Sequence, residues 1–293
     1  TNHSILRFAF ENNNKIYNLL LNAKGTDINA SLDDDGTTPL MIAVKDNDLA
    51  LAKKLLKKGA NPNLREASYY DSSMLSRAFS NNSIKMANLL ISNKININMK
   101  DSDGNTVLHE AVSKDNTEWV KNLIKNGARL NIKNNDDFSP LFLALIKESK
   151  KSFNLLVKNK KTDLETRSEE GATPLMNAAY FNKYYYAKLL IKYGADINAK
   201  NWDAGKRSAL DYARAQGSYD TKNLLISKNA ISGLEEAMYP AKPYPRNGYI
   251  TCNTRCNNGD CYRTYSDGRK RHFQAQQKWN PFTSSFEWDS GGC

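Results

Sequence analysis

Residues 171–198 read GATPLMNAAYFNKYYYAKLLIKYGADIN, and the pattern of this stretch returns along most of the chain. The leucine of its Thr-Pro-Leu start has a counterpart every 33 to 35 residues. An alanine stands three residues after each of these leucines, and an aliphatic pair follows further on. The seven anchor leucines are Leu6, Leu40, Leu75, Leu108, Leu141, Leu175 and Leu210. Agreement in three registers predicts a repeat rather than a coincidence.

A unit of this length is too small to bury its own apolar face, so successive units must stack into a continuous core. Thr173 suits the N-cap of a helix, and Pro174 suits the first turn, where no backbone N–H is needed. A second apolar segment, 186–191, ends before Gly194, which can adopt the left-handed conformation that stops a helix. Each unit is therefore predicted to be a helix pair. Its interior is predicted to include Leu40, Ala43, Leu55, Leu108, Ala111, Leu123, Leu175, Ala178 and Leu189.

The unit resembles the ankyrin repeat, with Thr173-Pro174-Leu175 as the helix start, Leu189-Leu190 as the aliphatic pair and 194–198 as the exit. The resemblance implies a mainly α-helical solenoid of about seven helix pairs that binds a protein through hairpin tips and a concave helix face. The predicted organisation is a repeat array over 1–231, a Pro/Tyr-rich linker over 232–249 and a small β-rich module over 250–293.

Three departures from the repeat pattern are visible in the sequence. The hairpin of 65–74 has no glycine before its leucine and carries Tyr69 and Tyr70, which predicts a distorted loop. The fifth repeat has Lys160-Lys161 in place of the Gly-Ala exit. The position after the anchor leucine is histidine only at His109. These departures predict that hydrogen bonding along the hairpins is not uniform.

Charge and hydropathy limit the kinds of partner. The chain has 42 Lys and Arg against 31 Asp and Glu, a net charge of +11, which favours acidic proteins, nucleic acid or anionic membrane surfaces as partners. No run approaches the roughly 18 apolar residues that a spanning helix requires. The chain begins Thr1-Asn2-His3-Ser4, which indicates either a trimmed chain or the removal of a leader peptide.

All four cysteines, Cys252, Cys256, Cys261 and Cys293, lie near the C-terminus, and the repeats contain none. A short segment with little apolar material and an even number of cysteines commonly needs disulfides, which persist in oxidising compartments. This predicts two disulfides and a periplasmic or secreted location. Reduced structural thiols and a zinc site are the alternatives, although the paired C-x2-C spacing typical of zinc ligands is missing. No metal or other cofactor is expected.

The C-terminal module is predicted to contain a β-hairpin formed by 261–265 and 269–276 around an Asp-Gly turn, and a second turn at Asn280-Pro281. Cations gather in the hairpin at Arg263, Arg269 and Arg271, next to His272. A histidine among cations can perform acid–base chemistry on a phosphodiester, so a nuclease-like activity is the catalytic alternative. The ordinary explanation is a solvated hairpin face, and no other catalytic motif is recognisable.

Aromatic residues concentrate in repeats five to seven. The anchor leucines and alanines already supply the core there, so several rings must face solvent, the linker or a partner. The predicted partner-binding residues are Tyr180, Phe181, Tyr184, Tyr185 and Trp202, together with Tyr69 and Tyr70.

Two classes of function therefore remain open. The first is a protein-binding scaffold built on the repeats, without enzymatic activity. The second is a secreted effector or toxin whose C-terminal module acts on nucleic acid, with the repeats as its carrier.

Overall fold

The structure is a computed structural model. It describes residues 23, 25–65, 73–202 and 206–234, and beyond these only the backbone of five strands between 252 and 289. Contacts divide the chain into two units, 1–239 and 240–293, which are described separately. The first predicted helix pair and the loop with Tyr69 and Tyr70 lie outside the described residues.

Twelve helices form six consecutive pairs within the described part of the array. The first helices are α3 (Pro39–Lys45), α5 (Met74–Ser80), α7 (Val107–Ser113), α9 (Pro140–Ile146), α11 (Pro174–Tyr180) and α13 (Ala209–Ala215). The second helices are α4 (Leu49–Lys57), α6 (Ile84–Ser92), α8 (Thr117–Lys125), α10 (Lys150–Val157), α12 (Tyr184–Lys192) and α14 (Tyr219–Ser227). None of the described helices is long and apolar enough to cross a membrane.

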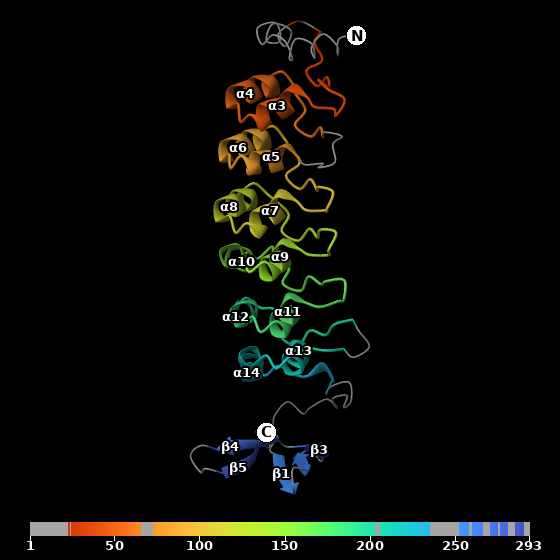
Figure 1. Cartoon of the computed structure of the whole chain (residues 1–293), viewed down its shortest axis with the longest axis vertical. Helices are drawn as coiled ribbons and strands as arrows, with labels where there is room; N and C mark the ends of the chain where they lie inside the picture. Colours follow the sequence, from red (N-terminus) through yellow and green to blue (C-terminus); the bar gives the residue numbers. More distant parts are fainter. Residues whose placement is uncertain are drawn as a thin grey trace. The chain divides into compact units, whose positions relative to one another are not determined.

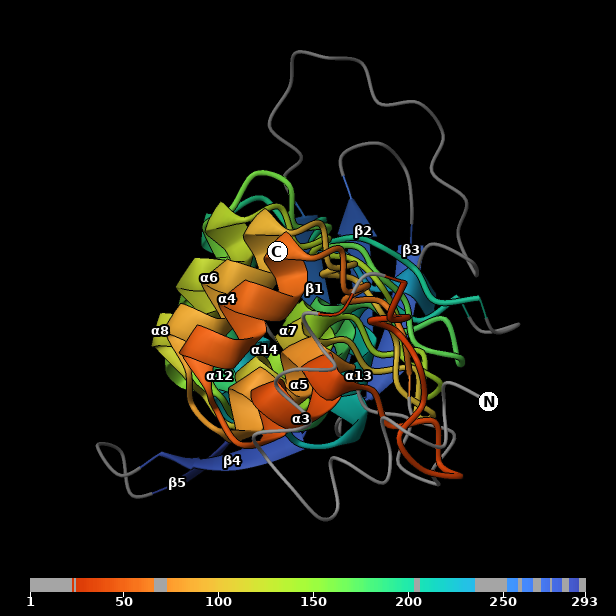
Figure 2. The same cartoon turned by 90° about the horizontal axis from the view of Figure 1, so that it is seen from above.

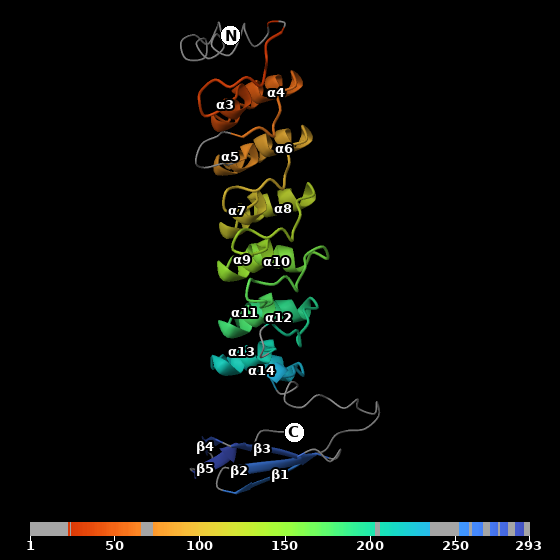
Figure 3. The same ribbon diagram turned by 90° about the vertical axis from the view of Figure 1, so that its right-hand side faces the viewer.

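The pairs stack in three columns (Figure 1). The even-numbered helices form one outer column, the odd-numbered helices lie in the middle, and the hairpin loops, here called fingers, project on the other side. Seen from above, helices and fingers occupy opposite sides of the array (Figure 2), and Figure 3 shows the same stacking from the side. The predicted helical solenoid is confirmed for these six repeats.

Each first helix begins where the sequence places a hydroxyl side chain. Thr173 is extended, and its Oγ1 accepts a hydrogen bond from the backbone N–H of Met176 at 3.3 Å. Pro174 follows at the start of α11, as predicted. The same position is occupied in the other described repeats by Thr38, Ser73, Thr106, Ser139 and Ser208.

The core runs along the array on two registers. The alanines three residues after each anchor leucine are fully buried at Ala43, Ala78, Ala111, Ala144, Ala178 and Ala213. The leucines fifteen residues after each anchor are also fully buried: Leu55, Leu90, Leu123, Leu156, Leu190 and Leu225. The prediction was wrong for Leu189, which is only partly buried. Consecutive helical residues point about 100° apart, so Leu190 faces the interior and Leu189 does not.

Glycine ends the second helices where the repeat is regular. Gly194 has φ +96° and no heavy atom within 4 Å of an added Cβ, so its conformation and not packing favours glycine, and Lys94 and Asn229 adopt positive φ at the equivalent positions. In the fifth repeat, α10 ends at Val157, one residue earlier relative to its anchor than the other second helices. The exit at Lys160-Lys161 has no residue with positive φ, which explains why lysines are accepted there.

Side-chain amides link successive repeats at the exit loops. The Asn of the exit, or Glu165 in the fifth repeat, accepts a hydrogen bond from a backbone N–H of the next repeat. The pairs run from Asn29 to Asn61 (2.7 Å), Asn63 to Asn96 (2.6 Å), Asn98 to Arg129 (2.8 Å), Asn131 to Asp163 (2.8 Å), Glu165 to Asp196 (2.7 Å) and Asn198 to Ile231 (2.8 Å). This column of hydrogen bonds is continuous through the described repeats, and it lies at the exit loops, apart from the hairpins for which irregular hydrogen bonding is predicted.

Asp211 fixes the end of the array. Its Oδ2 accepts hydrogen bonds from the backbone N–H of Ser208 at 2.8 Å and of Gly233 at 2.6 Å, and its Oδ1 accepts one from the hydroxyl of Ser232. Burial opposes ionisation, but these donors hold the pKa of Asp211 below its ordinary value. The carboxylate thereby ties the segment after the last helix to the start of α13.

The second unit contains five strands: β1 (Cys252–Asn257), β2 (Asp260–Tyr265), β3 (Lys270–Gln274), β4 (Gln276–Asn280) and β5 (Ser285–Asp289). The first three form an antiparallel sheet in the order β1-β2-β3, and β4 pairs with β5. β2 pairs antiparallel with both β1 and β3. The β-rich module stays a prediction. Disulfide formation stays a prediction, because the cysteine side chains are outside the described residues.

Candidate functional site: a groove between helices and fingers

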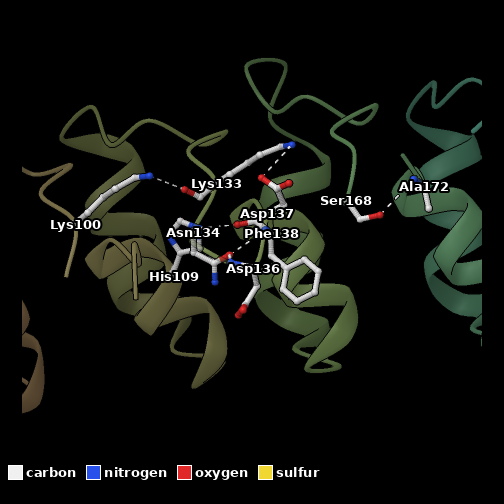
Figure 4. Close-up of polar contacts among 9 residues, drawn as sticks. All are labelled: Lys100, His109, Lys133, Asn134, Asp136, Asp137, Phe138, Ser168 and Ala172. Atoms are coloured by element: carbon white, nitrogen blue, oxygen red, sulfur yellow. Dashed lines mark hydrogen bonds and ion pairs between the residues drawn. The ribbon is translucent and has the colours of Figure 1, made fainter. Parts of the chain in front are cut away.

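The fingers are built on a repeated turn. The first residue of each tip accepts a hydrogen bond from the backbone N–H four residues later: Asp33 from Thr37, Asp101 from Asn105, Asn134 from Phe138 and Ser168 from Ala172. Figure 4 shows the Asn134 and Ser168 turns in neighbouring fingers. Because the first residue of the tip supplies the side-chain acceptor of the turn, the next two positions can carry many residue types.

Basic side chains at the base of the fingers connect one finger to the next. Lys100 Nζ donates to the carbonyl of Lys133 at 2.8 Å (Figure 4), and Arg65 Nη2 donates to the carbonyl of Lys100 at 2.6 Å. Arg167 Nη1 likewise reaches the carbonyl of Lys200 at 2.7 Å. These hydrogen bonds hold neighbouring fingers side by side, so that their side chains can form one continuous surface.

His109 joins α7 to the next finger. Its Nδ1 accepts a hydrogen bond from the N–H of Thr106 at 3.1 Å, which leaves Nε2 protonated to donate to the carbonyl of Phe138 at 3.1 Å (Figure 4). Burial lowers the pKa of His109, so the imidazole is neutral near neutral pH. It has a structural role, and no catalytic partner lies next to it among the described residues.

A groove of about 790 Å³ lies between α11, α13 and the two fingers that precede them. It is partly open to solvent and combines aromatic, acidic and amide side chains. Its lining residues are Glu169, Glu170, Ala172, Met176, Asn177, Tyr180, Phe181, Asn201, Trp202, Arg207 and Tyr212. The groove therefore contains three of the predicted partner-binding residues, Tyr180, Phe181 and Trp202.

The aromatic rings on the helical wall contact one another edge to face. The ring centroid of Tyr180 lies 4.8 Å from that of Phe181 and 6.2 Å from that of Tyr212, with interplanar angles of 79° and 71°. Such contacts hold the rings in place, and Lys183 Nζ lies 5.8 Å from the ring centre of Phe181. Tyr180 and Phe181 remain 40% and 53% exposed. The wall is preorganised, and much of its apolar surface stays in contact with water.

Trp202 forms the opposite wall and is 68% exposed. Its ring lies close above Gly171, and the guanidinium of Arg167 is 5.5 Å from the ring centre. Arg167 also donates to the carbonyl of Gly171 at 2.7 Å, so the same side chain supports both fingers of the groove. The cation–π contact and the finger backbone together orient the indole.

Tyr184 and Tyr185 do not join this groove. They belong to α12, in the outer column of Figure 1, and each ring contacts a lysine. Lys188 Nζ lies 5.9 Å from the ring centre of Tyr184, and Lys150 Nζ lies 5.8 Å from that of Tyr185. The hydroxyl of Tyr185 is also hydrogen-bonded to Asn154 of the preceding repeat. The structure thus separates the predicted aromatic set into a groove group and an outer group.

Tyr212 and the polar members of the groove were missed by the sequence analysis. Tyr212 stands two residues after its anchor leucine, and the same position in the preceding repeat is Asn177, also in the groove lining. This shared repeat position is a sequence signal for the two residues, but it does not show that they meet in one groove. Tyr69 and Tyr70 lie outside the described residues.

The catalytic alternative in the second unit is not assembled on one side of the sheet. The register pairs Arg263 with Arg271 and Tyr262 with His272. Since neighbouring residues of a strand belong to opposite faces, His272 falls on the face opposite Arg263 and Arg271. Arg269 lies outside the described residues. A nuclease-like activity remains a prediction that gains no support from this arrangement.

Comparison with known proteins identifies the array. The family description "Ankyrin repeats (3 copies)" matches residues 1–66, 75–168 and 153–234. The chain belongs to the ankyrin-repeat family. A human relative, "Ankyrin repeat and KH domain-containing protein 1", is 35% identical over 75 residues, which are 26% of this chain and 3% of that protein. A "Putative ankyrin repeat protein" of Rickettsia bellii is 44% identical over 48 residues, 16% of this chain and 29% of that protein.

Solved ankyrin-repeat structures have the same fold. The ankyrin repeat domain of Bcl-3 superposes with a TM-score of 0.60 at 24% identity, over 68% of this chain and 89% of that one. The ankyrin repeat protein EF0377 superposes with a TM-score of 0.55 at 25% identity, over 64% of this chain and 96% of that one. The chain spans under a third of the length of the two relatives named above, so their similarity is limited to a few ankyrin repeats.

Proposed function

We propose that this ankyrin-repeat chain is a protein-binding scaffold and that its partner docks in the groove formed by α11, α13 and the two adjacent fingers. Stacked repeats create extended surfaces suited to binding, and the helix–finger side of the array is one such surface. The observation that carries the proposal is the group of Tyr180, Phe181 and Trp202. These three rings line one groove and remain 40%, 53% and 68% exposed.

Exposed aromatic rings in a preorganised groove favour binding of another protein over a purely structural role. The array core is complete without these rings, because the alanine and leucine registers already fill it. Aromatic side chains contribute large contact areas at small conformational cost and dominate binding hot spots. Leaving them in water costs hydrophobic free energy, which a partner would recover.

Site-specific photo-crosslinking tests the proposal. The photoreactive amino acid p-benzoylphenylalanine replaces Phe181 in the groove or, as a matched control, Tyr184 on α12, and each full chain is irradiated in extracts of the cells that make it. We expect a discrete protein adduct from position 181 that is absent from position 184. The adduct should disappear when Trp202→Ala is added. Adducts of the same identity from both positions, or adducts unchanged by Trp202→Ala, would overturn the proposal.

A further inference from the structure

The fingertips carry acidic side chains beyond what their turns need. In four tips the first residue accepts the side-chain hydrogen bond of the turn, and further carboxylates follow it. Exposed carboxylates occur at Asp34, Asp35, Asp103, Asp136, Glu169 and Glu170. No Lys or Arg stands in the described tips 33–36, 101–104, 134–137 and 168–171. Because successive fingers project on the same side of the array (Figure 1), these residues form an acidic row.

The opposite column of the array has the opposite charge. The second helices contain Lys53, Lys54, Lys57, Lys85, Lys121, Lys125, Lys150, Lys151, Lys188, Lys192 and Lys222, against two acidic residues, Glu118 and Asp220. The second helices are therefore strongly cationic and the four described tips acidic, while basic side chains stand at the finger bases (Arg65, Lys100 and Arg167) and Arg207 lines the groove. Electrostatic attraction at the fingers selects a cationic partner, which net charge alone would not predict.

The groove lies at one end of the acidic row. Glu169 and Glu170 belong both to the row and to the groove lining, and neither carboxylate has a hydrogen-bond or ion-pair partner among the described residues. Carboxylates next to exposed aromatic rings are suited to a guanidinium or ammonium group, which can pair with the former and stack on the latter, as Arg167 already does on Trp202. The volume of about 790 Å³ exceeds that of a single side chain and suits several residues of a peptide.

The groove wall also contains a buried amide, of Asn201, whose oxygen has no hydrogen-bond partner among the described residues. Asn201 is 5% exposed, and its Nδ2 donates to the hydroxyl of Tyr212 at 2.6 Å. If the side-chain amide is flipped, Oδ1 accepts from the hydroxyl of Tyr212 and Nδ2 is the atom without a partner. A buried polar atom without a partner costs free energy, which marks this wall of the groove as a place where stability is given up.

We propose that the groove accepts an extended segment of a partner protein in which apolar side chains alternate with arginine or lysine. The apolar side chains pack on Tyr180, Phe181 and Trp202, and the cations pair with Glu169 and Glu170. Further cations on the segment meet Asp136 and Asp103 along the finger row. This assignment rests on the proposed protein-binding function and adds to it the chemistry of the partner.

Labelled peptides test this chemistry with the full-length chain. The probe is a ten-residue peptide, Gly-Ser-Arg-Leu-Arg-Leu-Arg-Leu-Gly-Ser, compared with one peptide carrying Glu in place of Arg and another carrying Ser in place of Leu. Fluorescence anisotropy measures each dissociation constant. We expect the Arg–Leu peptide to bind at least about tenfold more tightly than either control, with affinity falling as salt rises.

Two charge variants locate the effect. Glu169→Gln combined with Glu170→Gln should lower the affinity for the Arg–Leu peptide about three- to tenfold. The control is Glu118→Gln on α8, an exposed glutamate far from the groove, which should leave this affinity unchanged. Equal binding of the Glu–Leu peptide, or an unchanged affinity in the double Gln variant, would overturn the inference. An adduct at position 181 whose contacting segment is acidic would also overturn it, while leaving the protein-binding function intact.

Discussion

Trp202 lies so close to Gly171 that a Cβ added to this glycine would stand 2.8 Å from Cγ of the indole. Gly171 also has φ +77°, a conformation that other residues rarely adopt. The two residues come from neighbouring fingers, so their contact couples the shape of one finger to the position of the groove's most exposed ring. A glycine at the tip is thus favoured by its conformation and by the indole of Trp202 that packs against it.

Replacing Gly171 should displace the indole. We expect Gly171→Ala to change the fluorescence of Trp202, measured as the difference from a Trp202→Phe version of each chain, and to weaken partner binding. Gly194→Ala is the matched control, because Gly194 shares the positive φ but has nothing within 4 Å of an added Cβ. Both variants should lose stability through backbone strain. An identical Trp202 signal in the two variants would contradict the coupling.

The buried leucine register predicts an asymmetry within one aliphatic pair. Leu190→Ala should lower the free energy of unfolding by about 2–5 kcal/mol, because Leu190 is fully buried and its loss leaves a cavity. Leu189→Ala should cost less, since Leu189 is partly buried and water can fill part of the space. Urea unfolding followed by circular dichroism measures both. Equal losses, or a larger loss for Leu189→Ala, would show that the register is misplaced.

His109 should make stability depend on pH. Its pKa in the folded chain is below the ordinary value of 6.5, so its contribution is complete above pH 6.5 and is lost as the pH falls through the folded-state pKa. We expect the melting temperature of the chain to fall more between about pH 7.5 and 5 than that of His109→Gln, which cannot titrate. The other two histidines, His3 and His272, are present in both chains and cancel. Parallel pH profiles would rule out the imidazole as the cause.

The four cysteines are still expected to form two disulfides. The strand register makes Cys256 and Cys261 direct cross-strand neighbours, so a bond between them requires the least rearrangement and would leave Cys252 to pair with Cys293. Thiol titration of the unfolded, unreduced chain should find no free thiol, and peptide mapping should recover the 256–261 link. Four free thiols would reject the disulfides and remove the reason for expecting an oxidising compartment.

The sequence was sufficient for the repeats because each one satisfies local rules. Thr173, Pro174 and Gly194 fix the start and end of a helix pair through capping and backbone conformation, and Ala178 allows close packing. The aliphatic pairs were less informative, because the sequence does not say which of two adjacent apolar residues faces the core. The rotational position of the helix selects Leu190 over Leu189.

The groove was only partly predictable from the sequence. Aromatic excess identified Tyr180, Phe181 and Trp202, but the same excess also selected Tyr184 and Tyr185, which contact lysines on the outer helices. The membership of Tyr212 and Asn201 depends on residues from different repeats meeting in space. No spacing within one repeat contains that information, and the acidic row likewise emerges only when the fingers are stacked.

The most direct test of the account is the affinity of the full-length chain for the protein found by crosslinking at position 181. Isothermal titration would compare Phe181→Ala/Trp202→Ala in the groove with Tyr184→Ala/Tyr185→Ala on α12, which removes two rings with 41% and 39% exposure. The account predicts that the groove variant loses affinity about 30-fold or more, as for a binding hot spot, while the outer variant changes it by less than about threefold. A greater loss in the outer variant, or no loss in the groove variant, would contradict it.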